Sequence, residues 1–258
     1  MRASIPRWLS RDQLITLAGL IMLAAVSWWY LFGLAAAMPV TGAGDLLEFR
    51  HWTPSYYGMM LLMWVVMMAA MMTPSVTPMI LLYRQVARKN RLPHISMGTW
   101  LFMAGYLVMW ILFSLVATSL QWLLDEQAML NPMMRSKSES LSGLTLMGAG
   151  VYQFSRLKQA CLRQCRGPLL FITRHWHPGT AGAFRMGLVH GAYCIGCCGA
   201  LMALLFVGGV MDLTVVAAIA IVVLLEKVMP GGQRLAQALG VMILALGGYV
   251  LASGWAFR

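Results

Sequence analysis

The sequence predicts an all-α protein, a polytopic transmembrane helical bundle of about seven helices with its N-terminus in the cytoplasm. Composition, the length of the apolar runs and the distribution of loop charge all indicate this class. Hydrophobic residues make up 60% and charged residues 10% of the 258 residues, and the mean hydropathy is +0.73. Soluble domains have roughly 45–50% apolar and about 25% charged residues. A soluble globule is therefore excluded, and we expect one integral membrane domain over residues 1–258.

Seven apolar runs predict the spans, since a helix needs about 20 mostly apolar residues to cross a bilayer. The first run precedes Ala35, Ala36 and Ala37, as in a signal peptide. Its length of about 24 residues exceeds the roughly 7–15 of a signal-peptide core, so we expect an uncleaved helix. The fourth run is the weakest, because glycines interrupt it. The runs lie at 14–38, 56–83, 97–124, 141–160, 183–210, 213–229 and 234–256.

The loop charges predict the orientation of the helices. Lys and Arg gather in the N-terminal segment, in 84–96, in 156–182 and between the last two runs, whereas Asp and Glu dominate the alternate loops. Cytoplasmic loops of membrane proteins carry the excess of basic residues, so the N-terminus is predicted to be cytoplasmic. No basic stretch is interleaved with stacking aromatics, as a nucleic-acid site would need. We therefore attribute the net charge of +11 to basic loops that set the orientation in the membrane. The expected partner is membrane lipid and not nucleic acid.

The fifth run carries a stripe of thiols and one imidazole. At about 100° per residue, Met186, His190, Cys194 and Cys197 share an arc of roughly 80°, and Cys198 extends it to about 120°. Ionisable groups this deep in a bilayer are costly and usually functional. Thiolates with imidazole select Zn, Cu(I) or an iron–sulfur cluster. The alternative is that buried cysteines act as small hydrophobic residues, but several on one stripe favour a metal site.

Methionine is unusually frequent, with 23 residues, and it is concentrated in the second run. The spacing of these residues gives a narrow stripe on one helix face. Such a stripe is often simple packing. Thioethers, however, bind few biological metals well, and Cu(I) is the main one, with Zn or another soft metal as the alternative. The predicted thioether ligands are Met60, Met63, Met67 and Met71, with Met68 and Met72 widening the stripe.

A third group of candidate ligands follows the fourth run. Cys161 and Cys165 stand four residues apart, so they share a helix face and are spaced to bind one soft cation. The neighbouring Lys158, Arg163 and Arg166 are expected to lower the pKa of both thiols. The alternative is a pair of reduced cytosolic thiols without a ligand.

Glu226 and Lys227 end the sixth run. They form either a snorkelling pair that closes the helix or a second shell in which Glu226 supports His190. The sequence contains no nucleotide-binding loop, no HExxH and no GxSxG motif. It therefore predicts no catalytic residues and no organic cofactor, and enzyme chemistry would have to come from a bound metal.

At three motifs the chain resembles a family of bacterial integral membrane proteins known as the domain of unknown function DUF2182. That family is described as metal-binding and is often labelled copper chaperone. The chain departs from the family pattern at Gly199, where a Trp is expected, which puts the packing beside the cysteine pair in doubt. The motifs lie within residues 55–230 and read Trp64-x-x-Met67-Met68-x-Ala70-Met71-Met72-x-Pro74, Leu157-Lys158-x-x-Cys161-Leu162-x-x-Cys165-Arg166-x-Pro168 and Gly187-x-x-x-Gly191-x-Tyr193-Cys194-Ile195-Gly196-Cys197-Cys198.

The resemblance implies a multi-pass protein of the bacterial inner (cytoplasmic) membrane that handles copper. With the predicted ligands, we expect it to hold Cu(I) for delivery to, or retention near, a membrane cuproenzyme, with a soluble copper carrier as another partner. One alternative is a transporter that moves copper from the methionine stripe through the cysteines to Cys161 and Cys165. Others are a catalytic or accessory subunit of a metal-dependent membrane oxidase, and a scaffold in which the sulfur atoms only pack.

Overall fold

The computed structural model describes residues 11–37, 52–131 and 134–256, and these residues form helices. One isolated β-bridge joins Leu130 and Ser136. The all-α prediction is confirmed for this part of the chain. The helices are α1 (Arg11–Ala37), α2 (Pro54–Lys89), α3 (Ile95–Glu126), α4 (Glu139–Gln153), α5 (Arg156–Arg166), α6 (Pro168–His175), α7 (Gly179–Ala203), α8 (Leu205–Gly208), α9 (Leu213–Val228) and α10 (Gly232–Ala256).

Polar caps set the starts of several helices. The side chain of Thr53 accepts the backbone N–H of Tyr56 at the start of α2. Ser138 does the same for α4 and Ser155 for α5. Asp212 accepts two backbone N–H groups at the start of α9. Each cap satisfies donors that a helix N-terminus leaves without partners.

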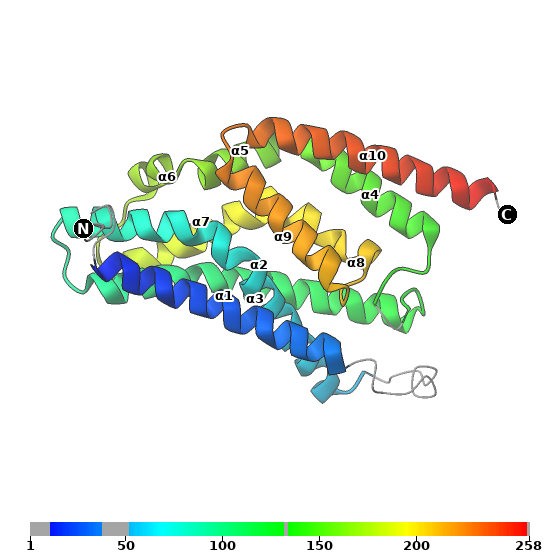
Figure 1. Cartoon of the computed structure of the whole chain (residues 1–258), viewed down its shortest axis with the longest axis horizontal. Coiled ribbons are helices and arrows are strands. Elements are labelled where there is room, and N and C mark those ends of the chain that lie inside the picture. Colours follow the sequence, from blue (N-terminus) through cyan, green and yellow to red (C-terminus); the bar gives the residue numbers. More distant parts are fainter. Residues whose placement is uncertain (1–10, 38–51, 132–133, 257–258) are drawn as a thin grey trace, which may run out of the picture.

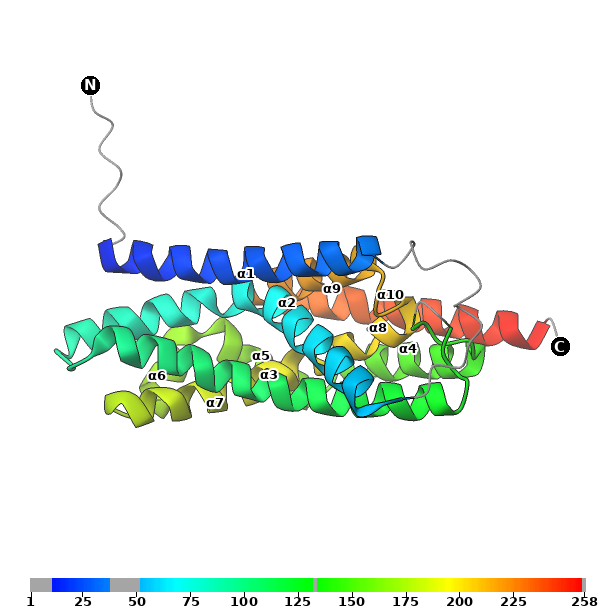
Figure 2. The ribbon, with the colours of Figure 1, turned by 90° about the horizontal axis from the view of Figure 1, so that it is seen from below.

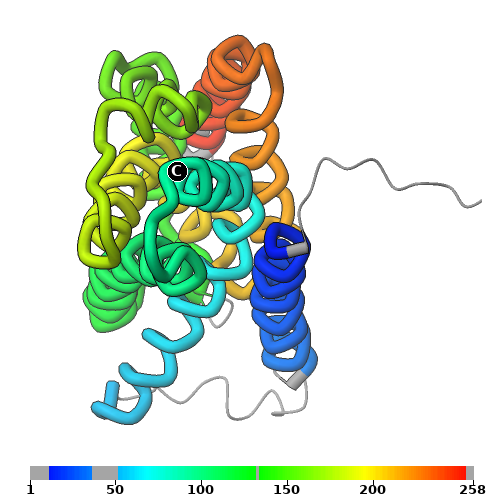
Figure 3. The backbone as a smooth tube through the Cα atoms, turned by 90° about the vertical axis from the view of Figure 1, so that its left-hand side faces the viewer, coloured from blue at the N-terminus to red at the C-terminus, as the bar shows by residue number. Residues whose placement is uncertain are grey.

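The long helices lie roughly along one axis of the molecule (Figure 1). Viewed along that axis, α2 passes through the interior, with α1, α3, α7 and α9 around it (Figure 3). This position explains why the methionine-rich face of α2 is buried. Figure 2 shows that α2 changes direction along its length. It contains Pro74 and Pro78, and a helix-interior proline removes a backbone hydrogen bond and kinks the helix.

Small residues bring α3 and α7 into close contact. A Cβ atom added at Gly105 of α3 would collide with the carbonyl oxygen of Phe184, and one at Gly187 of α7 would collide with that of Phe102. Small residues allow such backbone approach between membrane helices. As a result, Tyr106 of α3 faces Cys194 of α7.

Five helical stretches within the described residues are long and apolar enough to cross a membrane. The predicted count of seven spans is not supported, because α4 has 15 residues and α9 has 16. The fourth predicted span, 141–160, is wrong as one helix: α4 ends at Gln153, and Ser155 caps the new helix α5. The sixth corresponds to α9, whose length of about 24 Å is less than the roughly 30 Å hydrocarbon core. The five spans are Asp12–Ala36, Pro54–Lys89, Ile95–Glu126, Gly179–Gly208 and Gly232–Ser253.

The two ends of the bundle differ in charge. The α2–α3 connection, which carries Arg88, Lys89 and Arg91, lies at the end where α1 begins (Figure 1). Asp125 at the end of α3 and Asp212 before α9 lie toward the opposite end. The orientation of these ends relative to a membrane stays a prediction.

Candidate metal centre

The thiols of Cys194, Cys197 and Cys198 form a buried cluster in α7. Their Sγ atoms all lie within 4.8 Å of one another, and each residue is only 1% exposed. The cluster follows from the helix itself, since residues three and four apart share a face. The thiols of Cys197 and Cys198 donate to the backbone oxygen of Cys194 at 3.1 and 3.0 Å.

Helix α5 brings the other two cysteines to the same place. The Sγ atom of Cys165 lies 3.8 Å from that of Cys197. A Cβ atom added at Gly196 would lie 2.6 Å from the Sγ atom of Cys161, so Cys161 packs closely against this glycine. The hydroxyl of Tyr152 donates to the Gly196 carbonyl at 2.5 Å. All five cysteines are free, and they gather between α5 and α7.

The pKa of each α5 thiol is raised and not lowered. Burial raises the pKa of Cys161, with the Cys197 charge as a second cause. Hydrogen bonds with the Cys194 and Cys197 thiols, followed by burial, raise the pKa of Cys165. The sequence-based expectation of thiolates here was therefore wrong. The cations are engaged elsewhere: Lys158 pairs with Glu226, and Arg166 donates to backbone carbonyls after α9.

Lys227 points into the sulfur cluster. Its Nζ atom donates to the Cys194 sulfur at 2.9 Å and to the Ser75 hydroxyl at 3.1 Å. The hydroxyl of Tyr106 lies 3.1 Å from the same sulfur. An ammonium at this distance stabilises negative charge on sulfur, which is the form that binds metal. The structure therefore places Lys227 in direct contact with a candidate ligand.

Glu226 forms a buried ion pair that holds α5 against α9. Its Oε2 atom accepts from Lys158 Nζ at 2.8 Å, and the two side chains are 2% and 1% exposed. The Gln153 amide donates to the other carboxylate oxygen at 3.4 Å. The pair thus fixes the helix that carries Cys161 and Cys165. By binding Lys158, the Glu226 carboxylate helps to hold α5 and its two cysteines beside the cluster.

His190 lies one turn before Cys194 but outside the group of three thiols. It is 3% exposed, and its ring lies 5.0 to 6.1 Å from those of Phe102, Tyr106 and Phe171. Its Nδ1 atom is buried and has no hydrogen-bond partner among the described residues. Buried polar atoms are nearly always paired, so the unpaired Nδ1 atom makes His190 a candidate ligand in addition to the three thiols.

The predicted methionine stripe is buried along its whole length. Met60, Met63, Met67, Met68, Met71 and Met72 are each at most 2% exposed. At one end, the Met72 sulfur lies 4.0 Å from the Cys198 thiol. At the other end, Met60 contacts Gln121. The two ends are about 18 Å apart along α2.

The sequence did not single out Tyr106, Gln121 or Met134, which all contact candidate ligands. The first two are polar residues inside the apolar span of α3, and that alone was a signal. Met134 lies outside every predicted span and gave none.

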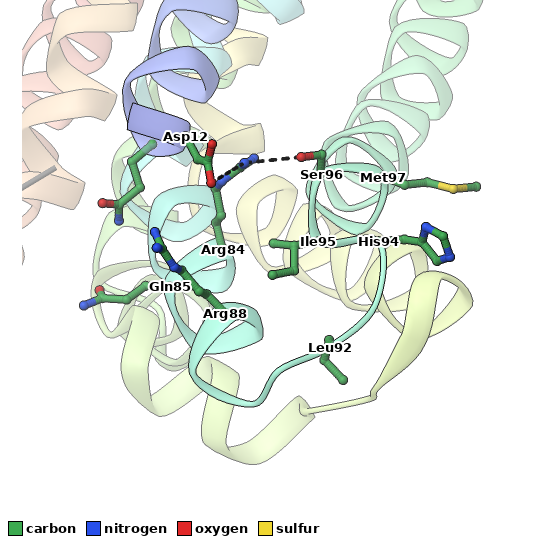
Figure 4. Close-up of a pocket in the computed structure, with 10 residues that line it drawn as sticks. Asp12, Arg84, Gln85, Arg88, Leu92, His94, Ile95, Ser96 and Met97 are labelled. Atoms are coloured by element: carbon green, nitrogen blue, oxygen red, sulfur yellow. Dashed lines mark hydrogen bonds and ion pairs between the residues drawn. The ribbon is translucent and has the colours of Figure 1, made fainter. Parts of the chain in front are cut away.

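A polar pocket of about 660 Å³ lies where α1, α2 and α3 meet, and it holds no cysteine. Figure 4 shows Arg84 at its centre, between Asp12 and Ser96. Arg84 donates to Thr16 at 2.8 Å and to Ser96 at 3.3 Å, and it lies 3.8 Å from Asp12. Arg84 thus links α1, α2 and α3. Because the pocket has no cysteine, the candidate site for a soft metal is the cysteine cluster and not this pocket.

Residues 61–250 match the sequence profile of the PpoB2 family, which is described as copper chaperone. The chain belongs to this copper chaperone family. The match covers the methionine stripe from Met63 onward, all five cysteines and Lys227. No curated protein and no solved structure shows a significant match to the chain. The name DUF2182 is not part of this match and stays a resemblance.

Proposed function

We propose that this protein is a membrane copper chaperone that holds Cu(I) as its cargo for delivery to a membrane cuproenzyme. The observation that carries the proposal is the group of three buried thiols within 4.8 Å of one another, in a chain of the copper chaperone family. Soft sulfur ligands select Cu(I) over harder ions. Cys194, Cys197 and Cys198 would be the main ligands.

The surroundings of the cluster suit an ion with one positive charge. Cu(I) bound by several thiolates is a net anion, and a buried anion is costly unless it is paired. Lys227 supplies a cation at 2.9 Å from Cys194. The thioether of Met72 lies 4.0 Å from the Cys198 thiol, and His190, one helical turn before Cys194, has a buried Nδ1 atom without a hydrogen-bond partner among the described residues; both are neutral candidate ligands.

Cys165 supports the delivery step. It lies 3.8 Å from Cys197, it is less buried than the α7 cysteines, and it belongs to a short helix outside the five spans. A copper ion would move by ligand exchange from an α7 thiolate to Cys165, whose thiol would give its proton to the α7 thiolate that is released, and then to a partner's ligands. The partner would be a cuproenzyme or a soluble copper carrier.

We further propose a multi-pass arrangement in the bacterial inner membrane with the N-terminus in the cytoplasm. The basic connections would face the cytoplasm, as the positive-inside rule requires. In this arrangement α4 and α9 complete seven crossings despite their length. Helix α4 lies beside α10 (Figures 1 and 2), so protein covers part of its surface.

A transporter is the second candidate, and the methionine stripe favours it. Buried thioethers extend from Met60 to Met72, next to Cys198, so the sulfur atoms form a line through the bundle. A chaperone needs the thiol site, whereas a transporter needs the line as well. Copper flux into proteoliposomes would distinguish the two.

The proposal is tested by metal analysis of the purified protein under reducing conditions. Titration with Cu(I) against a chelator of known affinity measures binding, and X-ray absorption identifies the ligand atoms. We expect a copper ion bound through thiolate sulfur, and the Cys194→Ser, Cys197→Ser and Cys198→Ser triple variant should lose this thiolate-bound ion. Tight zinc with substoichiometric copper would refute the choice of copper and leave a metal site.

A further inference from the structure

The end of the methionine stripe farthest from the cysteines contains two convergent thioethers. The Gln121 Nε2 atom lies 3.6 Å from the Met60 sulfur and 3.0 Å from the Met134 sulfur. All three residues are buried, with exposed fractions of 2% for Met60, 7% for Met134 and 1% for Gln121. Two sulfur atoms therefore face one point, which the amide group now occupies.

Trp64 fixes the orientation of that amide. Its indole N–H donates to the Gln121 Oε1 atom at 2.7 Å. An indole nitrogen only donates, so the atom that it contacts must be the amide oxygen, and the NH₂ group must face the sulfurs. Both thioethers consequently direct acceptor lone pairs at one donor. A thioether that binds a soft cation donates a lone pair to it in the same orientation.

Met134 reaches this point through an unusual backbone conformation. Its φ is 54°, a left-handed conformation that costs a non-glycine residue about 1–2 kcal/mol. Backbone hydrogen bonds hold the loop around it, from Met134 N to Asn131 O at 2.8 Å and from Ser136 N to Phe206 O at 2.9 Å. The following residue, Arg135, is exposed. The loop thus directs one methionine inward at a place that solvent can reach.

Charged residues of both signs lie near this end. Asp125 and the exposed Glu126 end α3, one turn beyond Gln121. Two exposed basic residues, Arg135 and Lys137, follow Met134, so the neutral thioethers and not the charge define the site. From Met60 the stripe continues through Met63, and it ends next to the thiols about 18 Å away along α2. Sulfur ligands therefore line the route from this end to the cysteine cluster.

We propose that Met60 and Met134 form a second, outer Cu(I) site, which takes up the ion and passes it to the methionine stripe. This inference rests on the proposed copper-binding function. Thioethers are neutral, so they bind Cu(I) without losing protons and select it over hard cations. The Gln121 amide keeps the two sulfurs in place in the metal-free protein, and the ion displaces it.

The test uses the full-length protein with Cys194, Cys197 and Cys198 all replaced by Ser, titrated with Cu(I) and examined by X-ray absorption. We expect one bound ion with thioether ligands. The further change of Met60→Leu and Met134→Leu should remove that one equivalent. Leu nearly conserves the volume of Met, and thermal stability reports folding. Met129→Leu, an exposed methionine of the same loop, is the matched control and should keep the ion.

The outcomes separate this inference from the proposed function. If the cysteine variant binds no copper while the parent binds one ion through thiolates, the outer site is refuted and the proposed function stands. The outer site is also refuted if the Met60→Leu/Met134→Leu change leaves the copper content of the cysteine variant unaltered. If neither the parent nor the cysteine variant binds copper, both ideas fail.

Discussion

Replacing Lys227 by Leu should weaken Cu(I) binding without removing or adding any copper ligand. The ammonium of Lys227 lies 2.9 Å from the Cys194 sulfur, and the residue is 8% exposed. Leu keeps most of the volume of the side chain, deletes the charge and brings no sulfur atom. The thiolate form of Cys194 then loses its nearest cation, and the copper–thiolate complex keeps an uncompensated negative charge.

The magnitude follows from the distance. At an effective dielectric constant of about 20, two unit charges 2.9 Å apart attract by about 6 kcal/mol. Part of this energy offsets the cost of burying the charges, and a hydrogen bond to a charged group contributes about 1.5–3 kcal/mol net. With 1.4 kcal/mol for each factor of ten, the Kd for Cu(I) should rise about 10–150-fold.

The assay is a competition titration with a Cu(I) chelator, run in detergent on the parent and on each variant. Lys227→Arg keeps the charge and should bind more tightly than Lys227→Leu. Lys137→Leu removes an exposed lysine and should leave the Kd unchanged. If Lys227→Leu binds copper as the parent does, Lys227 only fills space. Tighter binding would mean that the ammonium competes with copper for the sulfur, and either result refutes the reasoning.

Three further predictions concern the ligands and the topology. Cys194→Ser should weaken Cu(I) binding by more than the roughly 10–100-fold that is typical when a residue in contact with a metal ligand is changed, whereas Cys161→Ser should have a much smaller effect in the same titration. One Met→Leu change in the stripe should weaken Cu(I) binding only mildly, because neighbouring thioethers substitute for the lost one, but changing Met63, Met67 and Met71 together should weaken it severely. Parent-like copper binding by this triple variant would show that the stripe only packs. A reporter fused after Arg258 should be extracytoplasmic and one within 86–92 cytoplasmic, and the same location for both would refute the seven-crossing arrangement.

The coarse fold was readable from the sequence because the apolar runs are long and the composition is extreme. The spans that hold 20 or more apolar residues appear as helices of the expected length. The fourth run failed for a local reason: Ser155 caps a new helix, and an apolar average over 141–160 does not register a single capping residue. The run 213–229 matches α9 to within one residue, but the 16 residues of α9 are too few for it to be among the five spans.

The cluster of Cys194, Cys197 and Cys198 was likewise determined by the sequence. Spacings of three and four residues place side chains on one face of any α-helix, so the three thiols meet without help from other helices. The same rule gave the stripe on α2. Both features depend only on helical periodicity, which is fixed by the backbone.

Only the tertiary structure decided what surrounds those sulfur atoms. Cys165 meets Cys197 across 32 residues of sequence, and Lys227 meets Cys194 across 33. Such contacts depend on how closely and at what height two helices pack, and here that is set by features such as the glycines between α3 and α7 and the buried Lys158–Glu226 pair. Periodicity determines which residues share a face of one helix, but the packing of whole helices determines which faces meet.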